Sequence, residues 1–190
     1  MKQTRCDWAN GSLIYQQYHD NEWGKAQYSR NKLFEKLCLE GQQAGLSWIT
    51  VLRKRENYRA AFHQFIPEKV AQMSPQEISQ CLQNPGLIRH RKKLEAIVKN
   101  AQALLEMERN GENFSEFIWR FVNHQPIVNN VPDLQAVPAY CEISEKMSCA
   151  LKKRGFVFVG KTTCYAFMQA MGLVNDHLNH CFCKNAKNET

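Results

Sequence analysis

The sequence lacks any apolar run long enough to cross a bilayer, and its first eight residues lack the apolar core of a secretion signal. These absences predict a cytoplasmic protein with no membrane partner. Internal repeats and low-complexity segments are also absent, which argues against solenoid and linker architectures. Eight cysteines are present, and in a reducing compartment most should be thiols or metal ligands rather than disulfides.

Acidic residues are in the minority. The chain has 25 lysines and arginines against 18 aspartates and glutamates, for a formal net charge of +7. This balance favours a polyanionic partner such as nucleic acid, although many basic proteins bind none. A glycine-rich phosphate loop and a serine–histidine–aspartate arrangement are missing. The length of 190 residues and the hydrophobic share of 44% predict a single soluble domain, 1–190, that can bury a core.

Helical spacing of apolar residues dominates the chain, which predicts an all-α fold. We expect helices over 29–40, 46–62, 74–82, 89–109, 114–121, 144–154 and 161–171. Residues 125–138 hold three prolines and predict a loop. Residues 156–159 alternate Phe and Val like a strand, but no second strand is predicted to pair with them.

One helical segment carries an unusual acid. From Leu33 to Trp48, residues at steps of three and four share one face, and that face is apolar except for Glu40. A carboxylate buried without partners is costly. One interpretation is that a lysine, arginine or amide elsewhere satisfies Glu40, or that a break at Gly41 turns it to solvent. The other is that Glu40 lines a pocket and accepts hydrogen bonds from a ligand.

A second pattern suggests contact with DNA. A short helix capped at Ser74, the turn Asn84–Pro85–Gly86 and a basic start to the next helix predict a helix-hairpin-helix near residues 74–100. Amides at a helix N-terminus bind phosphate, and basic side chains add attraction to the backbone. A helical corner with a solvated charged face is the alternative. The candidates for DNA contact are Gly86, Arg89, Arg91 and Lys92.

A split set of cysteines and histidines suggests a metal. His177 and Cys181 are four residues apart, so one helical turn could present both, while Cys6 and His19 lie near the other end of the chain. Two cysteines and two histidines would make a closed, structural zinc site that pins the termini together. Ordinary buried thiols and surface histidines are the alternative. His180 and Cys183 compete as ligands.

Aromatic residues are interleaved with polar ones near the N-terminus: Trp8, Tyr15, Tyr18 and Trp23. Such rings can stack on a flat base, although they more often pack in a core. Asp20 and Glu22 lie within this segment, next to His19, and could orient His19 toward a metal.

Four strings in the sequence resemble the 3-methyladenine DNA glycosylase I family: Tyr-His-Asp-Asn-Glu-Trp-Gly at 18–24, Leu-Glu-Gly-Gln-Gln-Ala-Gly-Leu-Ser-Trp at 39–48, Lys-Lys-Arg-Gly-Phe at 152–156, and Gly-Leu-Val-Asn-Asp-His at 172–177. The resemblance extends to the polar tail, 184–190. It implies a helix-hairpin-helix DNA glycosylase fold with a zinc annex formed by 1–25 and 173–183. It also implies a monomer that excises 3-methyladenine from alkylated double-stranded DNA, leaving an abasic site without strand cleavage.

The resemblance also implies roles for individual residues. The ligands of one structural Zn²⁺ would be Cys6, His19, His177 and Cys181, although the extra His180 beside Cys181 departs from the pattern. Glu40 would be the catalytic residue that accepts hydrogen bonds from the extruded base. Tyr15, Tyr18 and Trp48 would line its pocket, with Trp8 and Trp23 in support. Gly45 and Leu46 would lie at the gap left by the flipped nucleotide.

The resemblance also bears on the reaction. Methylation at N3 makes the base cationic, and the base departs neutral, so strong acid catalysis is unnecessary. Many glycosylases of this fold place an aspartate shortly after the hairpin, but here none occurs between Gly86 and Asp133. We therefore expect discrimination in the pocket, where Glu40 accepts from the adenine edge and aromatic faces favour a cationic ring. The rival functions are a non-catalytic DNA-binding module and an enzyme for free alkylated nucleosides.

Overall fold

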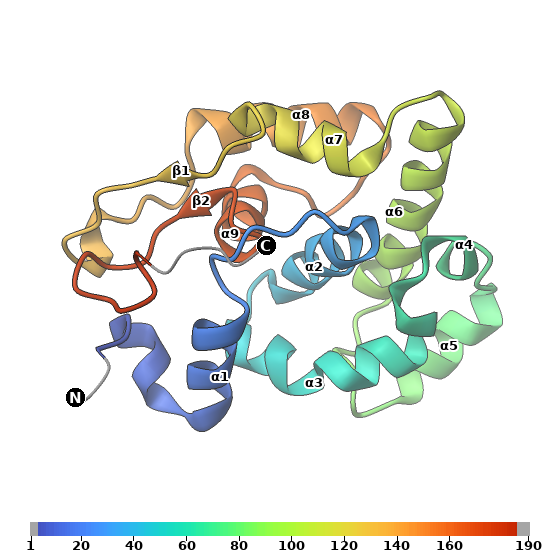
Figure 1. Cartoon of the computed structure of the whole chain (residues 1–190). Helices are drawn as coiled ribbons and strands as arrows, with labels where there is room; N and C mark the ends of the chain where they lie inside the picture. The colour runs from blue at the N-terminus through green and yellow to red at the C-terminus, as the bar shows by residue number, and fades with distance from the viewer. Residues whose placement is uncertain (1–3, 186–190) are drawn as a thin grey trace.

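The structure, a computed structural model, describes residues 4–185, and this part of the chain is mostly helical (Figure 1). The helical elements are, in chain order, η1 (Asp7–Gly11), α1 (Leu13–Asn21), α2 (Arg30–Gln43), α3 (Trp48–Ala61), η2 (His63–Phe65), α4 (Pro67–Val70), α5 (Pro75–Gln83), α6 (Arg91–Arg109), α7 (Phe114–Trp119), η3 (Arg120–Val122), η4 (Leu134–Ala136), α8 (Glu142–Lys153) and α9 (Lys161–Ala170). The strands within the described range are β1 (Ile127–Val128) and β2 (Val174–Asn175).

Helix α2 is central. It packs against α3, α6, α7 and α9, and in Figure 1 it lies between the α7–α8 layer and α3. The helix continues past Glu40, so the interpretation in which a break at Gly41 turns this acid to solvent is wrong. A Cβ at Gly41 would lie 3.2 Å from the Cβ of Phe158, so glycine permits close packing inside the helix.

The α5–α6 hairpin forms where the sequence predicts two helices joined by a turn. Ser74 and Glu77 make the expected capping box at the start of α5. The turn is tight at Gly86, where a Cβ would lie 2.7 Å from the side chain of Asn57. Helix α6 begins at Arg91, two residues later than expected, because the His90 ring caps it by accepting from a backbone amide of the first turn.

Two expectations about extended segments are wrong. Within 125–138, the predicted loop, Ile127 and Val128 form β1, which pairs in parallel with β2 in the register Ile127 to Val174. Residues 156–159 form no strand, because Phe158 has a φ of +56° and Val157 bonds through both backbone groups to the Asn100 side chain. A tertiary partner therefore overrides the local β propensity of this segment.

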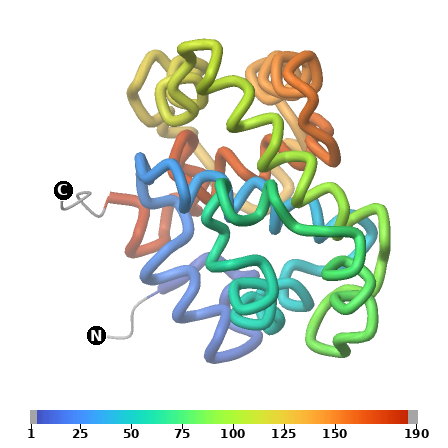
Figure 2. Tube along the Cα trace, turned by 90° about the vertical axis from the view of Figure 1, so that its right-hand side faces the viewer, coloured from blue at the N-terminus to red at the C-terminus, as the bar shows by residue number. Residues whose placement is uncertain are grey.

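The two ends of the described chain lie beside each other. The backbone amide of Phe182 donates to the carbonyl of Thr4 at 2.9 Å, and Figure 2 shows both ends on the same side of the molecule. A small apolar cluster separate from the main core contains Cys6, Val131, Leu178, Cys181 and Cys183. Among residues 4–185, no helix combines the length and apolar character needed to cross a membrane.

Candidate active site and metal centre

A cavity of about 480 Å³ lies where the N-terminal segment meets α2, α3 and α9. Such a volume is typical of small-ligand sites. It is lined by Trp8, Tyr15, Tyr18, Trp23, Glu40, Gln43, Trp48, Leu134, Val137, Ala166, Gln169 and Asp176. Glu40 and the five aromatic residues singled out in the sequence therefore line the same cavity. They come from different elements: α1 contributes Tyr15 and Tyr18, and α3 contributes Trp48.

The aromatic rings brace one another. The Trp8 ring meets Tyr15 edge-on at 5.5 Å between centroids and Trp23 at 5.2 Å. Tyr18 lies 5.6 Å from Trp48, tilted by 41°. The Tyr15 hydroxyl accepts from the backbone amide of Ile49 at 2.9 Å, which ties α1 to the first turn of α3. These contacts hold the rings in defined orientations around the cavity.

Glu40 is 5% exposed and forms an ion pair within its own helix. Its Oε1 lies 3.0 Å from Nζ of Lys36, one turn earlier. A lysine of the same helix therefore pairs with Glu40, as one interpretation expects, and Glu40 also lines a cavity, as the other expects. Each carboxylate oxygen has two lone pairs, so the ion pair leaves Glu40 able to accept hydrogen bonds from a ligand.

Lys36 is a residue of this site that the sequence reasoning missed. It is 6% exposed, its Nζ donates to the Tyr18 hydroxyl at 2.5 Å, and it lies 3.4 Å from the centroid of the Trp48 ring. Burial lowers the pKa of Lys36, while the charge of Glu40 and its hydrogen bond oppose that change. The available signal was its spacing of four residues before Glu40, which is the spacing of helical ion pairs.

Asp176 is a second carboxylate of the cavity wall to which the sequence reasoning gave no role. It accepts from Asn129 at 2.6 Å, from the Tyr165 hydroxyl at 2.7 Å and from Gln169 at 2.8 Å. Three donors from the protein occupy this carboxylate, so it is held as part of the wall. Asp133, the first aspartate after the hairpin, is exposed and caps η4.

The predicted metal ligands form a compact buried cluster. One ligand atom each from Cys6, His19, His177 and Cys181 lies within 4.8 Å of all the others. The Cys6 Sγ is 3.5 Å from Nδ1 of His177, and the Cys181 Sγ is 3.4 Å from Nε2 of His19. Zinc bonds of about 2.3 Å to sulfur and 2.0 Å to nitrogen in a tetrahedron imply sulfur–nitrogen separations of roughly 3.5 Å. The donor set and its spacing therefore fit a closed zinc site.

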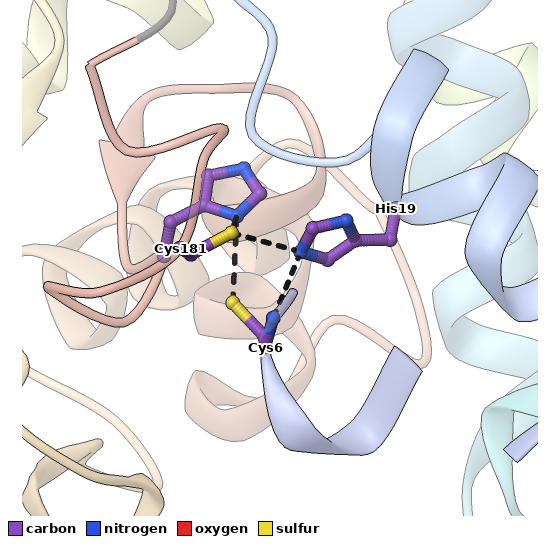
Figure 3. Close-up of side chains that lie close together, drawn as sticks. Cys6, His19 and Cys181 are labelled. Carbon is purple, nitrogen blue, oxygen red and sulfur yellow. Dashed lines mark hydrogen bonds between the residues drawn. The ribbon is translucent and has the colours of Figure 1, made fainter. Parts of the chain in front are cut away.

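Figure 3 shows Cys6, His19 and Cys181 pointing toward one another from the N-terminal segment, α1 and the C-terminal loop. The orientation of the His19 ring is fixed by Asp20, whose Oδ1 lies 2.8 Å from Nδ1, so that Nε2 faces the cluster. Asp20 is itself held by Arg5. Glu22 pairs with Arg55 instead, at 2.5 Å. Of the two acids considered, Asp20 is the one in contact with a predicted ligand.

One part of the reasoning about this cluster is wrong. His177 and Cys181 do not share a helical turn, because the chain after β2 is irregular here. They come together through a turn in which the Cys181 amide donates to the carbonyl of Leu178, while the Leu178 amide donates to Cys6 Sγ at 3.3 Å. Hydrogen bonds from Cys183 and Cys6 hold the pKa of the Cys181 thiol far below its usual range, whereas the contact with Cys181 and burial raise the pKa of Cys6.

The competing ligands are less well placed. The Cys183 Sγ lies 3.9 Å from Nδ1 of His19, the nitrogen that already meets Asp20. His180 is exposed and lies outside the cluster. The geometry therefore favours Cys181 over both.

The predicted DNA-contact residues of the hairpin lie on the surface. Arg89, Arg91 and Lys92 are exposed where α6 begins. The amide of Gly86 donates to Asn84 Oδ1 at 2.8 Å, so this amide is used inside the turn rather than offered to a phosphate.

The segment that follows α2 is also exposed, from Ala44 to Ser47. Gly45 has a φ of +78°, and Leu46 is 41% exposed. Buried Lys93 of α6 donates to the carbonyls of Gln42 and Ala44, at 2.9 Å and 2.5 Å, and so fixes the end of α2 to the hairpin helix. The sequence analysis assigned no role to Lys93, because it follows several basic residues that are expected to lie on a solvated face.

Comparison with known proteins identifies the family. The sequence model of the family described as methyladenine glycosylase matches residues 8–184. The chain is 68% identical to DNA-3-methyladenine glycosylase of Haemophilus influenzae, over 96% of this chain and 99% of that protein. It is 58% identical to DNA-3-methyladenine glycosylase 1 of Escherichia coli, over 94% and 96%.

Solved structures agree. A crystal structure of 3-methyladenine DNA glycosylase I superposes with a TM-score of 0.93 at 56% identity, covering 95% of this chain and 99% of that one. A 3-methyladenine DNA glycosylase I solved in complex with 3-methyladenine gives 0.91 at 40% identity, covering 95% and 97%. From this agreement of sequence and structure along nearly its whole length, the chain belongs to the methyladenine glycosylase family.

Proposed function

We propose that the cavity receives 3-methyladenine swung out of alkylated double-stranded DNA, and that the chain hydrolyses its N-glycosidic bond there. The products are the free base and an abasic site, with no strand cleavage. The observation that carries the proposal is a buried carboxylate, Glu40, in an aromatic-walled cavity of about 480 Å³. Release of the base matches the activity named for the relatives above.

The wall suits a purine. Flat rings can stack on the aromatic faces, and Glu40 can accept from the exocyclic amine on the adenine edge. In the part of the chain that the structure describes, the indole N–H of Trp48 is buried without a hydrogen-bond partner. Buried donors are normally paired, so this N–H leaves the site short of an acceptor in the absence of a ligand or water.

The reaction requires little acid catalysis from the protein, because the leaving base is already cationic. The bond between C1′ and N9 breaks, its electron pair passes to the base, and the cationic base becomes neutral. Water then adds to C1′ and loses a proton. A proton donor for the leaving group is unnecessary, which agrees with a site whose second carboxylate, Asp176, is occupied by three donors from the protein. Extrusion from the stack costs least for a damaged base.

Binding to DNA rests on surface features. The α5–α6 pair would act as the helix-hairpin-helix near 74–100, with Arg89, Arg91 and Lys92 attracting the phosphate backbone and Gly86 making the turn tight. Gly45 and the exposed Leu46 would fill the gap left by the extruded nucleotide. A binding module without catalysis would not need Glu40 in an aromatic cavity, and an enzyme for free nucleosides would not need these cations.

Zinc would have a structural role. The four proposed ligands lie within 4.8 Å of one another and would complete a tetrahedral zinc site, so no coordination position would remain for water or substrate. The ion would cross-link an annex, 1–25 and 173–183, within a single domain, 1–190. The predicted tail, 184–190, falls largely outside the described residues. A monomeric, cytoplasmic enzyme is part of the same proposal.

The test is release of base from DNA treated with a methylating agent, followed by analysis of strand integrity. We expect the wild type to release 3-methyladenine and leave intact, alkali-sensitive strands. Glu40→Gln should lower the rate about 100-fold or more, because it removes the charged acceptor aimed at the base. The matched control is Glu35→Gln on the same helix, whose carboxylate pairs with Arg59 at 2.8 Å and does not line the cavity. Equal rates for Glu40→Gln and Glu35→Gln would refute the role of Glu40.

A further inference from the structure

Phe158 has a strained backbone and an exposed aromatic ring. Its φ is +56°, in the left-handed region that bulky side chains rarely adopt. The residue is 37% exposed, so burial of the ring does not account for the strain. Backbone conformations of this kind persist only where the surrounding structure enforces them, and they gather at sites that contact a ligand. Phe158 is therefore a candidate for contact with a partner.

The loop around Phe158 is fixed on three sides. Before it, the Val157 amide donates to Oδ1 of buried Asn100 at 2.8 Å, and Nδ2 of Asn100 donates to the Val157 carbonyl at 3.1 Å. After it, the Val159 carbonyl accepts from a buried serine of α8 at 2.6 Å. Beside it, α2 has Gly41, where a Cβ would lie 3.2 Å from the Cβ of Phe158. These contacts hold the strained backbone and leave the ring at the surface.

The hairpin helix positions Phe158 and Leu46 alike. Lys93 and Asn100 are seven residues apart on α6, so they share one face of that helix. Lys93 binds the carbonyls at the end of α2, just before Leu46, and Asn100 binds the loop that carries Phe158. Both loops with an exposed apolar side chain are thus anchored to the helix whose first turn would meet the DNA backbone.

Both loops also lie beside the entrance to the base cavity. A smaller cavity of about 190 Å³ lies between Gly45–Leu46 and the first turn of α9, and it reaches the surface at exposed Thr162. This cavity and the base cavity share three lining residues: Glu40, Gln43 and Ala166. Phe158 precedes α9 by three residues and lies against Gly41, one turn before Gly45. An extruded nucleotide that enters here would pass near both apolar side chains.

The charge of this region favours a polyanion. Between Glu145 and Asp176 the sequence has no acidic residue and five basic ones: Lys146, Lys152, Lys153, Arg154 and Lys161. Three of them pair with glutamates, whereas the exposed Lys152 and Lys153 form no ion pair among residues 4–185. An aromatic ring among cations suits a nucleic acid that offers an unstacked base, and a duplex with an extruded nucleotide offers one.

We propose that Phe158 is a second apolar contact with the duplex, beside Leu46, and that its ring stacks on a base exposed when the damaged nucleotide leaves the helix. This inference rests on the proposed function. Apolar side chains that enter a disturbed base stack are a common device of DNA-binding proteins. Because the base face is available only after extrusion, the contact would favour the extruded state. Phe158 does not line the base cavity, so it is a positioning residue.

The test compares two duplexes of the same sequence. In the abasic duplex a tetrahydrofuran analogue replaces one nucleotide, and the intact duplex has no such gap. The key variant is Phe158→Gly, because glycine adopts a positive φ freely and so keeps the loop while the ring is lost. We expect binding to the abasic duplex to weaken about tenfold, as for the loss of one stacked base. Binding to the intact duplex should change little, since its bases stay stacked.

A neutral ring also predicts a distinct response to salt. Phe158→Gly should leave the slope of affinity against salt concentration unchanged, because the ring releases no counterion. Phe158→Tyr keeps the ring and should retain most of the wild-type affinity for the abasic duplex. Fluorescence anisotropy with labelled duplexes measures both quantities.

The matched control is Tyr28→Ala. Tyr28 is another exposed aromatic residue, stacked on Trp119 just before α2 begins, roughly 15 Å or more from Gly41 along the helix. Its loss should leave the ratio of the two dissociation constants at the wild-type value. Binding of free 3-methyladenine reports on the base cavity, and Phe158→Gly should match the wild type there.

The outcomes separate this inference from the proposed function. A Phe158→Gly protein with the wild-type ratio for the two duplexes overturns the contact. Equal weakening of both duplexes, or a matching loss of binding to free 3-methyladenine, would indicate a general distortion and would overturn it as well. A wild type that releases no 3-methyladenine from DNA would refute the proposed function, while a selective loss of the abasic duplex in Phe158→Gly would still support the contact.

Discussion

Two buried polar clusters differ in how they are completed. In the pocket, Lys36 and Glu40 lie one turn apart on α2 and balance each other's charge. In the terminal cluster, Cys6 and His177 meet across 171 residues, and the four ligand atoms lie within 4.8 Å of one another. The first cluster is an ion pair whose two charges balance, so it needs no further ion. The second brings together groups that bind a metal when deprotonated, so its stability should depend on one.

Removal of one terminal ligand should have the largest effect on stability. We expect Cys6→Ser to lower zinc content from about one per chain and the free energy of unfolding by about 3 kcal/mol or more, because the ion would tie both ends of the fold together. For a domain of this size the corresponding fall in Tm is roughly 6–12 °C. Metal analysis and thermal melts measure both, and a strong chelator should reproduce the change in the wild type.

The contrast between the two clusters predicts that a substitution in one cluster leaves the other intact. Lys36→Met/Glu40→Gln should retain zinc, and Cys6→Ser should lose it. A Cys6→Ser protein that binds zinc as tightly as the wild type would remove Cys6 from the ligand set and bring Cys183 back into consideration.

A smaller effect should come from the acid beside His19. Asp20→Asn keeps the shape of the side chain but removes the charge that fixes the ring at 2.8 Å, so we expect zinc affinity to fall about 10- to 100-fold. The matched control is Glu22→Gln, two residues away, whose partner is Arg55. Competition with a zinc chelator measures both variants. Equal affinities for the two variants would mean that Asp20 does not support the ligand.

Much of the helical fold could be predicted because its signals are local. The capping box at Ser74 and the long apolar stripe of α6 are visible in the sequence, and both elements form within two residues of the expected positions. The β1–β2 pair could not be predicted, since two-residue strands 47 positions apart carry no periodic pattern. The strand expected at 156–159 fails because Asn100 holds Val157 in a loop.

The residues of the candidate site also fall into two groups, those that the sequence indicates and those that only tertiary packing reveals. Helical spacing singled out Glu40, the resemblance to a family gave it and the aromatic rings a common pocket, and all of them line one cavity in the structure. Composition and spacing alone left the ligand set open, and the helical turn expected from His177 to Cys181 does not exist. The sequence alone does not indicate Lys36, because a lysine in an amphipathic segment is normally expected to be exposed to solvent. Only the tertiary packing shows that it is buried against Trp48.

The smallest expected effect concerns charges outside both clusters, at the start of α6. Lys92→Ala should weaken binding to DNA a few-fold for any sequence and reduce the salt-dependence slope by about one, because one phosphate contact and its released counterion are lost. Arg109→Ala, at the far end of the same helix and paired with Glu106, is the control and should leave the slope unchanged. Titrations over a range of salt concentrations, at fixed pH, measure the slope. Since Lys92 contacts neither cluster, zinc content and binding of free 3-methyladenine should match the wild type. Equal slopes for the two variants would place the DNA away from the hairpin, and the pocket would then need another route by which the damaged strand approaches it.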